Sequence, residues 1–251
     1  MIRTSMAVGL GVVVCLVGGC AILDSLIPRP LEYYVTATPT NLTPQHSVDP
    51  EDGAVVYDIE GLQVRARLMS DKELNDMEPD KSYRENATNP FTYGIWKDPV
   101  KRYTPVRFCV FHIAVYNYPF AKVELDPAQA VLETDRGGKY TYYDIRESDA
   151  PNSFEKYYKS LSGQSGNEEF WYEERMGLVR SRLYRREEPV FKGDPYDGML
   201  VFDPLHEDVK HIRLVIKDFV LRFDSYGNPL DTQDVYFEFD IDQGVRQASK
   251  E

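Results

Sequence analysis

The chain has 251 residues and a formal charge of −12, and 42% of its residues are hydrophobic and 13% aromatic. This apolar content is enough for a packed core and excludes a wholly disordered chain. Because an acidic surface repels phosphate backbones, we expect no nucleic acid among the partners.

The first twenty residues combine a basic start with a short apolar run. Arg3 precedes the apolar residues 6–17, and the run ends in Leu16-Val17-Gly18-Gly19-Cys20. A membrane-spanning helix needs about 20 apolar residues. The shorter run, with no basic patch after it, therefore favours a cleaved signal peptide over a transmembrane anchor.

This ending resembles the lipobox of bacterial lipoproteins, in which small residues precede a cysteine that receives a diacylglyceryl group. The resemblance implies that residues 1–19 are removed and that lipid on Cys20 holds the mature protein on a membrane. In Gram-negative lipoproteins an Asp after this cysteine favours the inner membrane. Ala21 stands there instead, which implies the outer membrane, on either its periplasmic or its outer face. A plain secretory signal with an unmodified cysteine is the alternative.

Removal of the signal leaves 251 − 19 = 232 residues, enough for one large domain or two small ones. Cys109 is then the one cysteine left without lipid, so no internal disulfide is expected. The apolar neighbours of Cys109 predict that its thiol is buried.

Residues 20–53 carry five prolines, which predict an extended tether of up to ~90 Å. Residues 31–36 are β-prone and form the alternative within it, an edge strand.

The predicted folded domain spans residues 54–242. Apolar and polar residues alternate over 62–68, which indicates a half-buried strand. Ser70 and Glu73 have the spacing of a capping box, so a short helix should follow. The turn-rich residues 79–105 then carry four aromatic side chains, Phe91, Tyr93, Trp96 and Tyr103. Such residues in a loop either pack over a sheet edge or form an interaction surface for carbohydrate or peptide.

Further strands and a helical stretch complete the domain. Residues 107–118 are apolar on both faces and predict a central strand, and 125–134 and 139–145 predict a hairpin around Gly137-Gly138. Residues 151–188 switch to helical spacing, with one helix expected at 154–161 and another at 167–188. Strands return between residues 190 and 241, and residues 243–251 are expected to be a flexible tail.

The predicted fold is mainly β: an immunoglobulin-like antiparallel β-sandwich with a helical insertion at about residues 151–188. Residues 189–202 run from Pro189 through Phe191-Lys192-Gly193-Asp194 to Gly198-Met199-Leu200-Val201-Phe202. They are similar to the closing part of immunoglobulin-like, telokin-like domains in an uncharacterised family of bacterial lipoproteins. The resemblance covers residues 54–242 and implies no catalytic residue.

Metal ligands and cofactor motifs are sparse. His206 and His211 flank two acidic residues and are weak metal candidates, and the alternative is a solvated loop. Asp224 and Asp231 surround a turn that could hold calcium weakly, although an ordinary hairpin turn is the stronger expectation. No phosphate-binding, dinucleotide or nucleophile motif occurs in the sequence. We therefore expect no cofactor.

Two functions fit these features. The first is a membrane-anchored envelope lipoprotein that acts as a non-enzymatic structural or protein-binding module with an envelope protein partner. The second is a glycan-binding or glycan-cleaving envelope protein, suggested by Trp96, Trp171, 18 tyrosines and many acidic residues. A cleft with a carboxylate pair would favour cleavage, whereas tryptophans buried in the core would exclude the glycan hypothesis.

Overall fold

The computed structural model describes residues 29–161 and 168–248. The predicted signal peptide, Cys20 and the last three residues of the predicted tail lie outside this part of the chain. The strands are β1 Leu31–Thr40, β2 His46–Val48, β3 Val55–Ile59, β4 Leu62–Leu68, β5 Cys109–Tyr116, β6 Lys122–Val123, β7 Ala130–Thr134, β8 Lys139–Thr141, β9 Val190–Phe191, β10 Pro195–Phe202, β11 His211–Phe223 and β12 Pro229–Gln247. The helices are α2 Asp71–Met77, α3 Pro79–Ser82, α4 Phe154–Leu161 and α5 Glu168–Arg182, with a 3-10 turn at Pro127–Gln129.

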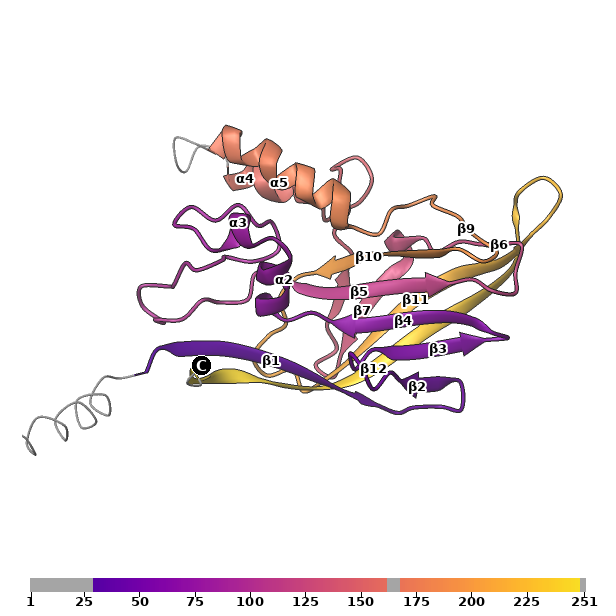
Figure 1. The fold of residues 1–251 in the computed structure, drawn as a ribbon, viewed down its shortest axis with the longest axis horizontal. Helices are drawn as coiled ribbons and strands as arrows, with labels where there is room; N and C mark the ends of the chain where they lie inside the picture. Colours follow the sequence, from indigo (N-terminus) through magenta and orange to yellow (C-terminus); the bar gives the residue numbers. More distant parts are fainter. Residues whose placement is uncertain (1–28, 162–167, 249–251) are drawn as a thin grey trace, which may run out of the picture.

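Two antiparallel five-stranded sheets form a sandwich (Figure 1). One sheet has the order β1-β12-β11-β7-β8, and the other has the order β10-β5-β4-β3-β2. Strands β6 and β9 pair separately. The predicted mainly β, antiparallel sandwich with a helical insertion is thus confirmed, and its immunoglobulin-like classification stays a prediction.

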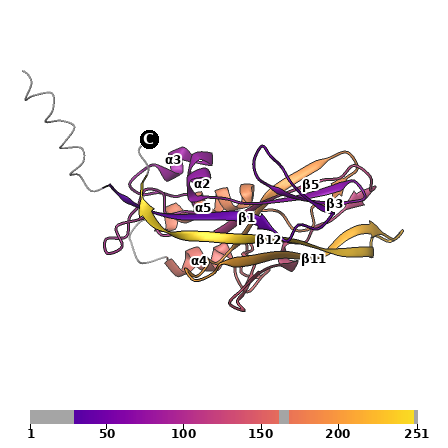
Figure 2. The same cartoon turned by 90° about the horizontal axis from the view of Figure 1, so that it is seen from below.

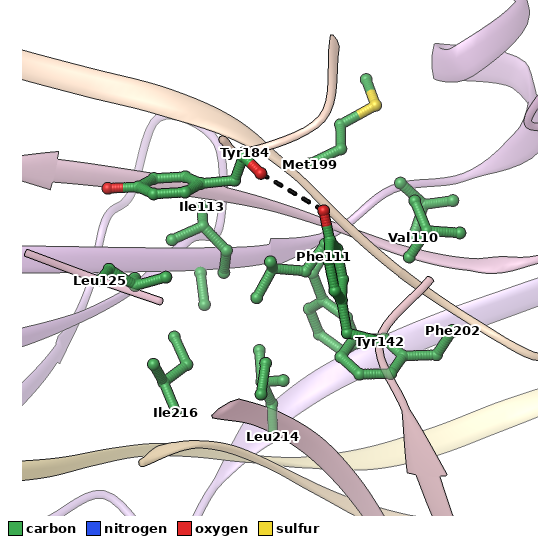
Figure 3. Packing of buried hydrophobic residues seen from close by; sticks show 14 of the residues in the cluster. Val110, Phe111, Ile113, Leu125, Tyr142, Tyr184, Met199, Phe202, Leu214 and Ile216 are labelled. Carbon is green, nitrogen blue, oxygen red and sulfur yellow. Dashed lines mark hydrogen bonds between the residues drawn. The ribbon is translucent and has the colours of Figure 1, made fainter. Parts of the chain in front are cut away.

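The core lies between the two sheets and follows the period of the strands. In β4 the side chains of Leu62, Val64 and Ala66 are fully buried, while the intervening residues are half-buried. Strand β5 lies between β10 and β4 and is buried on both faces, as its apolar sequence predicts. Figure 3 shows Tyr142 within this core, where its hydroxyl donates to the carbonyl oxygen of Tyr184 at 3.3 Å.

Over residues 31–40 the predicted tether is wrong, and the alternative of an edge strand that begins at residue 31 is confirmed. Residues 31–40 form β1, which pairs with β12 from Leu31↔Gln247 to Thr40↔Glu238. The prolines did not prevent this because Pro39 lies in an edge strand, where a missing backbone donor is tolerated. The same pairing extends β12 as far as Gln247, so residues 243–247, predicted to be part of a flexible tail, are a strand instead.

The helices gather toward the end of the sandwich at which β1 begins (Figures 1 and 2). Ser70 and Glu73 form the predicted capping box of α2, and α4 has the predicted bounds. Helix α5 ends at Arg182, earlier than predicted, because Tyr184 leaves the helix and donates its backbone N–H to the carbonyl oxygen of Met199 in β10 at 3.0 Å. Among the described residues, no helix has the length and apolarity to span a membrane.

Candidate binding groove

The long connection between α3 and β5 is ordered by a buried asparagine. The side-chain amide of Asn89 donates to the carbonyl oxygen of Leu74 and to the hydroxyl of Ser82, both at 2.9 Å. Its side-chain oxygen accepts from the backbone N–H of Phe91 at 2.9 Å. Phe91 is buried against the ring of Phe154 in α4, with 5.8 Å between ring centroids. The loop is therefore fixed to both α2 and the helical insertion.

Arg107 closes this loop from the segment just before β5. One terminal nitrogen donates to the carbonyl oxygens of Thr92 at 2.9 Å and Asn89 at 3.3 Å, and to the hydroxyl of Tyr158 at 3.3 Å. The guanidinium carbon lies 4.1 Å from the ring centroid of Tyr93, a cation–π distance. The loop and α4 thus hold Arg107 in place.

A groove of about 460 Å³ opens between this loop and the helical insertion. Its walls carry four aromatic side chains, two guanidinium groups, one carboxylate and three further residues. The aromatic residues are Tyr93, Trp96, Tyr157 and Trp171, the cations are Arg107 and Arg175, and the others are Glu85, Asn86, Ala87 and Leu161.

The described lining of the groove has two guanidinium groups and one carboxylate, an excess of positive charge in a protein whose formal charge is −12. Burial alone would lower the pKa of Arg107, but the phenol oxygens of Tyr158, Tyr157 and Tyr93 hold that pKa above its ordinary value. No carboxylate within the described residues forms an ion pair with Arg107, and its Nε has no hydrogen-bond partner there. At the rim, the carboxylate of Glu174 is neutralised by Lys81 and by Arg84 at 2.8 Å. The groove is therefore suited to an anionic ligand.

The tryptophans are not buried in the core. Trp96 is 46% exposed and Trp171 is half-buried. The guanidinium carbon of Arg84 lies 5.3 Å from the ring of Trp171, and the rings of Tyr93 and Trp96 are 5.6 Å apart. Flat aromatic faces next to cations can stack on planar or ring-shaped ligand groups.

The predicted aromatic interaction surface divides into two parts. Tyr93 and Trp96 line the groove, as that prediction requires, but Phe91 and Tyr103 are buried and cannot contact a partner. Tyr103 instead stacks on Tyr33 of β1, at 5.7 Å between centroids, because a polar loop needs apolar anchors to stay ordered.

Arg107 and Arg175 were not among the predicted site residues. The spacing of Trp171 and Arg175, four residues apart on a helix, was an available signal for a shared face. Arg107 had no comparable signal, because only the fold brings the segment before β5 beside Tyr93.

The weak metal candidates do not converge. Asp224 is used by its own turn, where it accepts from the backbone N–H groups of Tyr226 and Asn228, both at 2.8 Å. Asp231 lies 3.9 Å from Arg222, His206 lies 3.6 Å from Asp208, and His211 contacts Asp240 at 3.1 Å. Within the described residues, no group of three or more His, Cys, Asp or Glu side chains is arranged to hold a metal ion.

A second cavity of about 300 Å³ lies between β1 and the start of α2, with Val106 and Phe108 on one wall. Asp71 lines it, and burial raises the pKa of this carboxyl to about 7 despite the opposing field of Arg107. Because Arg107 stands between Val106 and Phe108 in the chain and lines the groove, this extended segment separates the two cavities.

Comparisons with protein-family models, with curated proteins and with solved structures each found no match to this chain. The residues of the groove and the N-terminal sequence are therefore the two indications of function.

Proposed function

We propose that this chain is a lipid-anchored protein of the bacterial cell envelope whose β-sandwich is a non-enzymatic binding module. Its groove binds an acidic segment of an envelope protein partner. The observation that carries the proposal is Arg107, a half-buried guanidinium that forms no ion pair with a carboxylate of the described residues, in a groove with Tyr93 and Trp96.

A carboxylate is the natural counterion for such a site. Arginine presents several N–H donors in a plane and binds carboxylates through charge-assisted hydrogen bonds. Aromatic residues and arginine are also the residue types that dominate the energy of protein interfaces. A short acidic segment that enters the groove would stack on the rings of Trp96 and Trp171 while its carboxylates approach the guanidinium groups.

The anchor is supported by the sequence that ends in Gly18-Gly19-Cys20. Leu31, the first residue of β1, lies eleven positions after Cys20, with ten residues between them. A fully extended chain of that length reaches at most about 40 Å. Lipid on Cys20 would therefore keep the sandwich close to the membrane rather than at the end of a long tether.

Affinity purification of the full-length chain from crosslinked, solubilised envelopes tests this function. We expect a recurrent protein partner with the natural chain, and loss of that partner with Trp96→Ala. Tyr226→Ala is the matched control, because Tyr226 is 90% exposed on the hairpin between β11 and β12 and lies outside the groove. Repeated recovery of the chain alone, or equal recovery of the partner with both variants, would overturn the proposal.

Binding of an acidic glycan is the second candidate, because Trp96 and Trp171 line one groove and neither is buried in the core. Glu85 is the one carboxylate among the groove's described lining residues. Glycosidic cleavage usually requires two carboxylates, so the groove favours binding over cleavage. Calorimetry with oligogalacturonate would show saturable heat that Trp171→Ala abolishes if the ligand is a glycan.

A further inference from the structure

An exposed basic and apolar loop projects beside the start of β1. We call residues 95–102 the Val100 loop. Its sequence is Ile-Trp-Lys-Asp-Pro-Val-Lys-Arg. Val100 is 88% exposed and Ile95 is 50% exposed, which is unusual for side chains that a folded protein normally shields from water.

The Val100 loop is a hydrogen-bonded turn. One carboxylate oxygen of Asp98 accepts from the backbone N–H groups of Val100 and Lys101, both at 2.8 Å. The backbone N–H of Asp98 donates to the carbonyl oxygen of Tyr103 at 3.0 Å, and the N–H of Arg102 donates to the carbonyl oxygen of Asp98 at 2.7 Å. These bonds hold the valine at the tip of the turn, pointing away from the core.

The charge of the loop opposes that of the whole protein. Lys97, Lys101 and Arg102 are exposed, and the single carboxylate, Asp98, is used by the turn. The loop therefore carries a net positive charge on a chain whose formal charge is −12. Apolar side chains flanked by lysine and arginine are typical of surfaces that enter the interface of an anionic bilayer.

The position of the loop matches the end of the protein that faces the anchor. Figures 1 and 2 both show the segment around residue 100 beside the start of β1. The ring of Tyr103, next to the loop, stacks on Tyr33 of β1. With at most about 40 Å of chain between Cys20 and Leu31, this end is the one that lies nearest to the membrane.

The opposite end gives a useful contrast. Tyr226 is 90% exposed and Leu230 is 70% exposed at the hairpin between β11 and β12, far from the start of β1 (Figure 1). That hairpin carries Asp224 and Asp231 and has no lysine between residues 222 and 234. Two exposed apolar tips thus differ in charge, and the basic one lies on the side of the anchor.

We propose that the Val100 loop inserts into the interface of an anionic phospholipid membrane and so fixes the orientation of the sandwich on it. This inference rests on the proposed lipid anchor for its geometry. Val100 and Ile95 enter the boundary between headgroups and acyl chains, and the three cations contact lipid phosphates. The groove is then held at a set height and angle above the membrane.

The test uses the full-length chain with a fluorescent label at Val100→Cys. The natural Cys109 stays unlabelled because it is buried. The chain without an introduced cysteine is labelled in the same way, and any signal that it gives from Cys15 or from unlipidated Cys20 is subtracted. The protein is reconstituted into vesicles with a majority of phosphatidylethanolamine and a minority of phosphatidylglycerol, with and without nitroxide-labelled lipid. Tyr226→Cys carries the same label as the matched control. Trp96 is left unchanged because it lines the groove.

We expect the emission at position 100 to shift to the blue and to lose most of its intensity with nitroxide lipid, while the label at position 226 keeps its emission. Lys97→Glu combined with Lys101→Glu should reduce the quenching at position 100. Equal emission at positions 100 and 226 would overturn the inference.

Mass spectrometry of the N-terminal peptide reports the anchor separately. A lipidated chain whose position 100 is not quenched overturns the loop proposal alone. A chain without lipid that still shows quenching at position 100 in excess vesicles overturns the anchor and supports the loop. A chain with neither property overturns both.

Discussion

Arg107 and Tyr93 face each other across the base of the groove, with the guanidinium carbon 4.1 Å from the ring centroid. The same guanidinium donates to backbone carbonyl oxygens of the loop that carries Tyr93. One side chain therefore both shapes the loop and, together with Arg175, supplies positive charge to the groove. Substitution of Arg107 should therefore affect both the stability of the fold and the binding of the proposed ligand.

Replacing this side chain should destabilise the fold. Arg107→Met keeps an apolar stem but leaves the carbonyl oxygens of Thr92 and Asn89 without their donor. We expect a loss of about 3 kcal/mol in the free energy of unfolding, because each buried polar group left unpaired costs about 1–3 kcal/mol. Urea denaturation measures it. Arg222→Met, on an exposed side chain, is the control and should change stability by about 0.5 kcal/mol or less.

Asp71 should make the stability depend on pH. Its pKa is raised from 3.8 to about 7 by burial, so the folded protein binds more protons than the unfolded chain between these values. Stability conferred by the protonated form is therefore lost as pH rises through that window. Each pH unit corresponds to about 1.4 kcal/mol, so Asp71→Asn should be more stable than the natural chain by up to about 4 kcal/mol at pH 8.

The control for Asp71→Asn is the same comparison of stability at acidic pH. Near pH 4 the natural carboxyl is protonated in the folded state, and the advantage of Asp71→Asn should nearly vanish. Urea denaturation at both pH values measures the difference. An advantage of equal size at both would contradict the raised pKa and would point to an effect of the amide itself.

Local patterns in the sequence predicted local structure well. Alternation over residues 62–68 predicted β4, and the spacing of Ser70 and Glu73 predicted the capping box, because both depend on neighbouring residues. Strand β1 was weakly marked, because its stability comes from pairing with β12, about 200 residues away. Prolines in that segment indicated an extended chain but gave no information on its partner.

The groove was predictable only in part. Tyr93 and Trp96 were identifiable because aromatic side chains in a polar loop usually either pack against the fold or bind a partner. Whether each such residue is buried or exposed depends on what the fold places above it, and α4 covers Phe91 while β1 covers Tyr103. Burial decided by tertiary neighbours has no local signal.

Two glycines should respond to the same substitution in opposite directions. A Cβ on Gly198 would lie 2.6 Å from the backbone N and Cα of Tyr184, which neither atom can avoid by a side-chain rotation. Gly198→Ala should cost about 2–3 kcal/mol. Gly177 lies within α5 with open space around its Cβ position, so Gly177→Ala should stabilise by about 0.5–1 kcal/mol. Thermal and urea unfolding measure both, and a destabilised Gly177→Ala would contradict the helix.

The thiol of Cys109 should be unreactive while the protein is folded. Cys109 is 5% exposed at the start of β5, and burial raises its pKa to about 12. Thiolate is the reactive form, so the folded protein offers almost none of it at pH 8. We expect reaction with a chromogenic disulfide reagent to follow the unfolded population and to become fast in concentrated urea. Gly198→Ala, which raises that population, should speed the reaction without urea, and Gly177→Ala should slow it. Rapid reaction of the natural folded chain would show that the end of the sandwich around Cys109 opens without global unfolding.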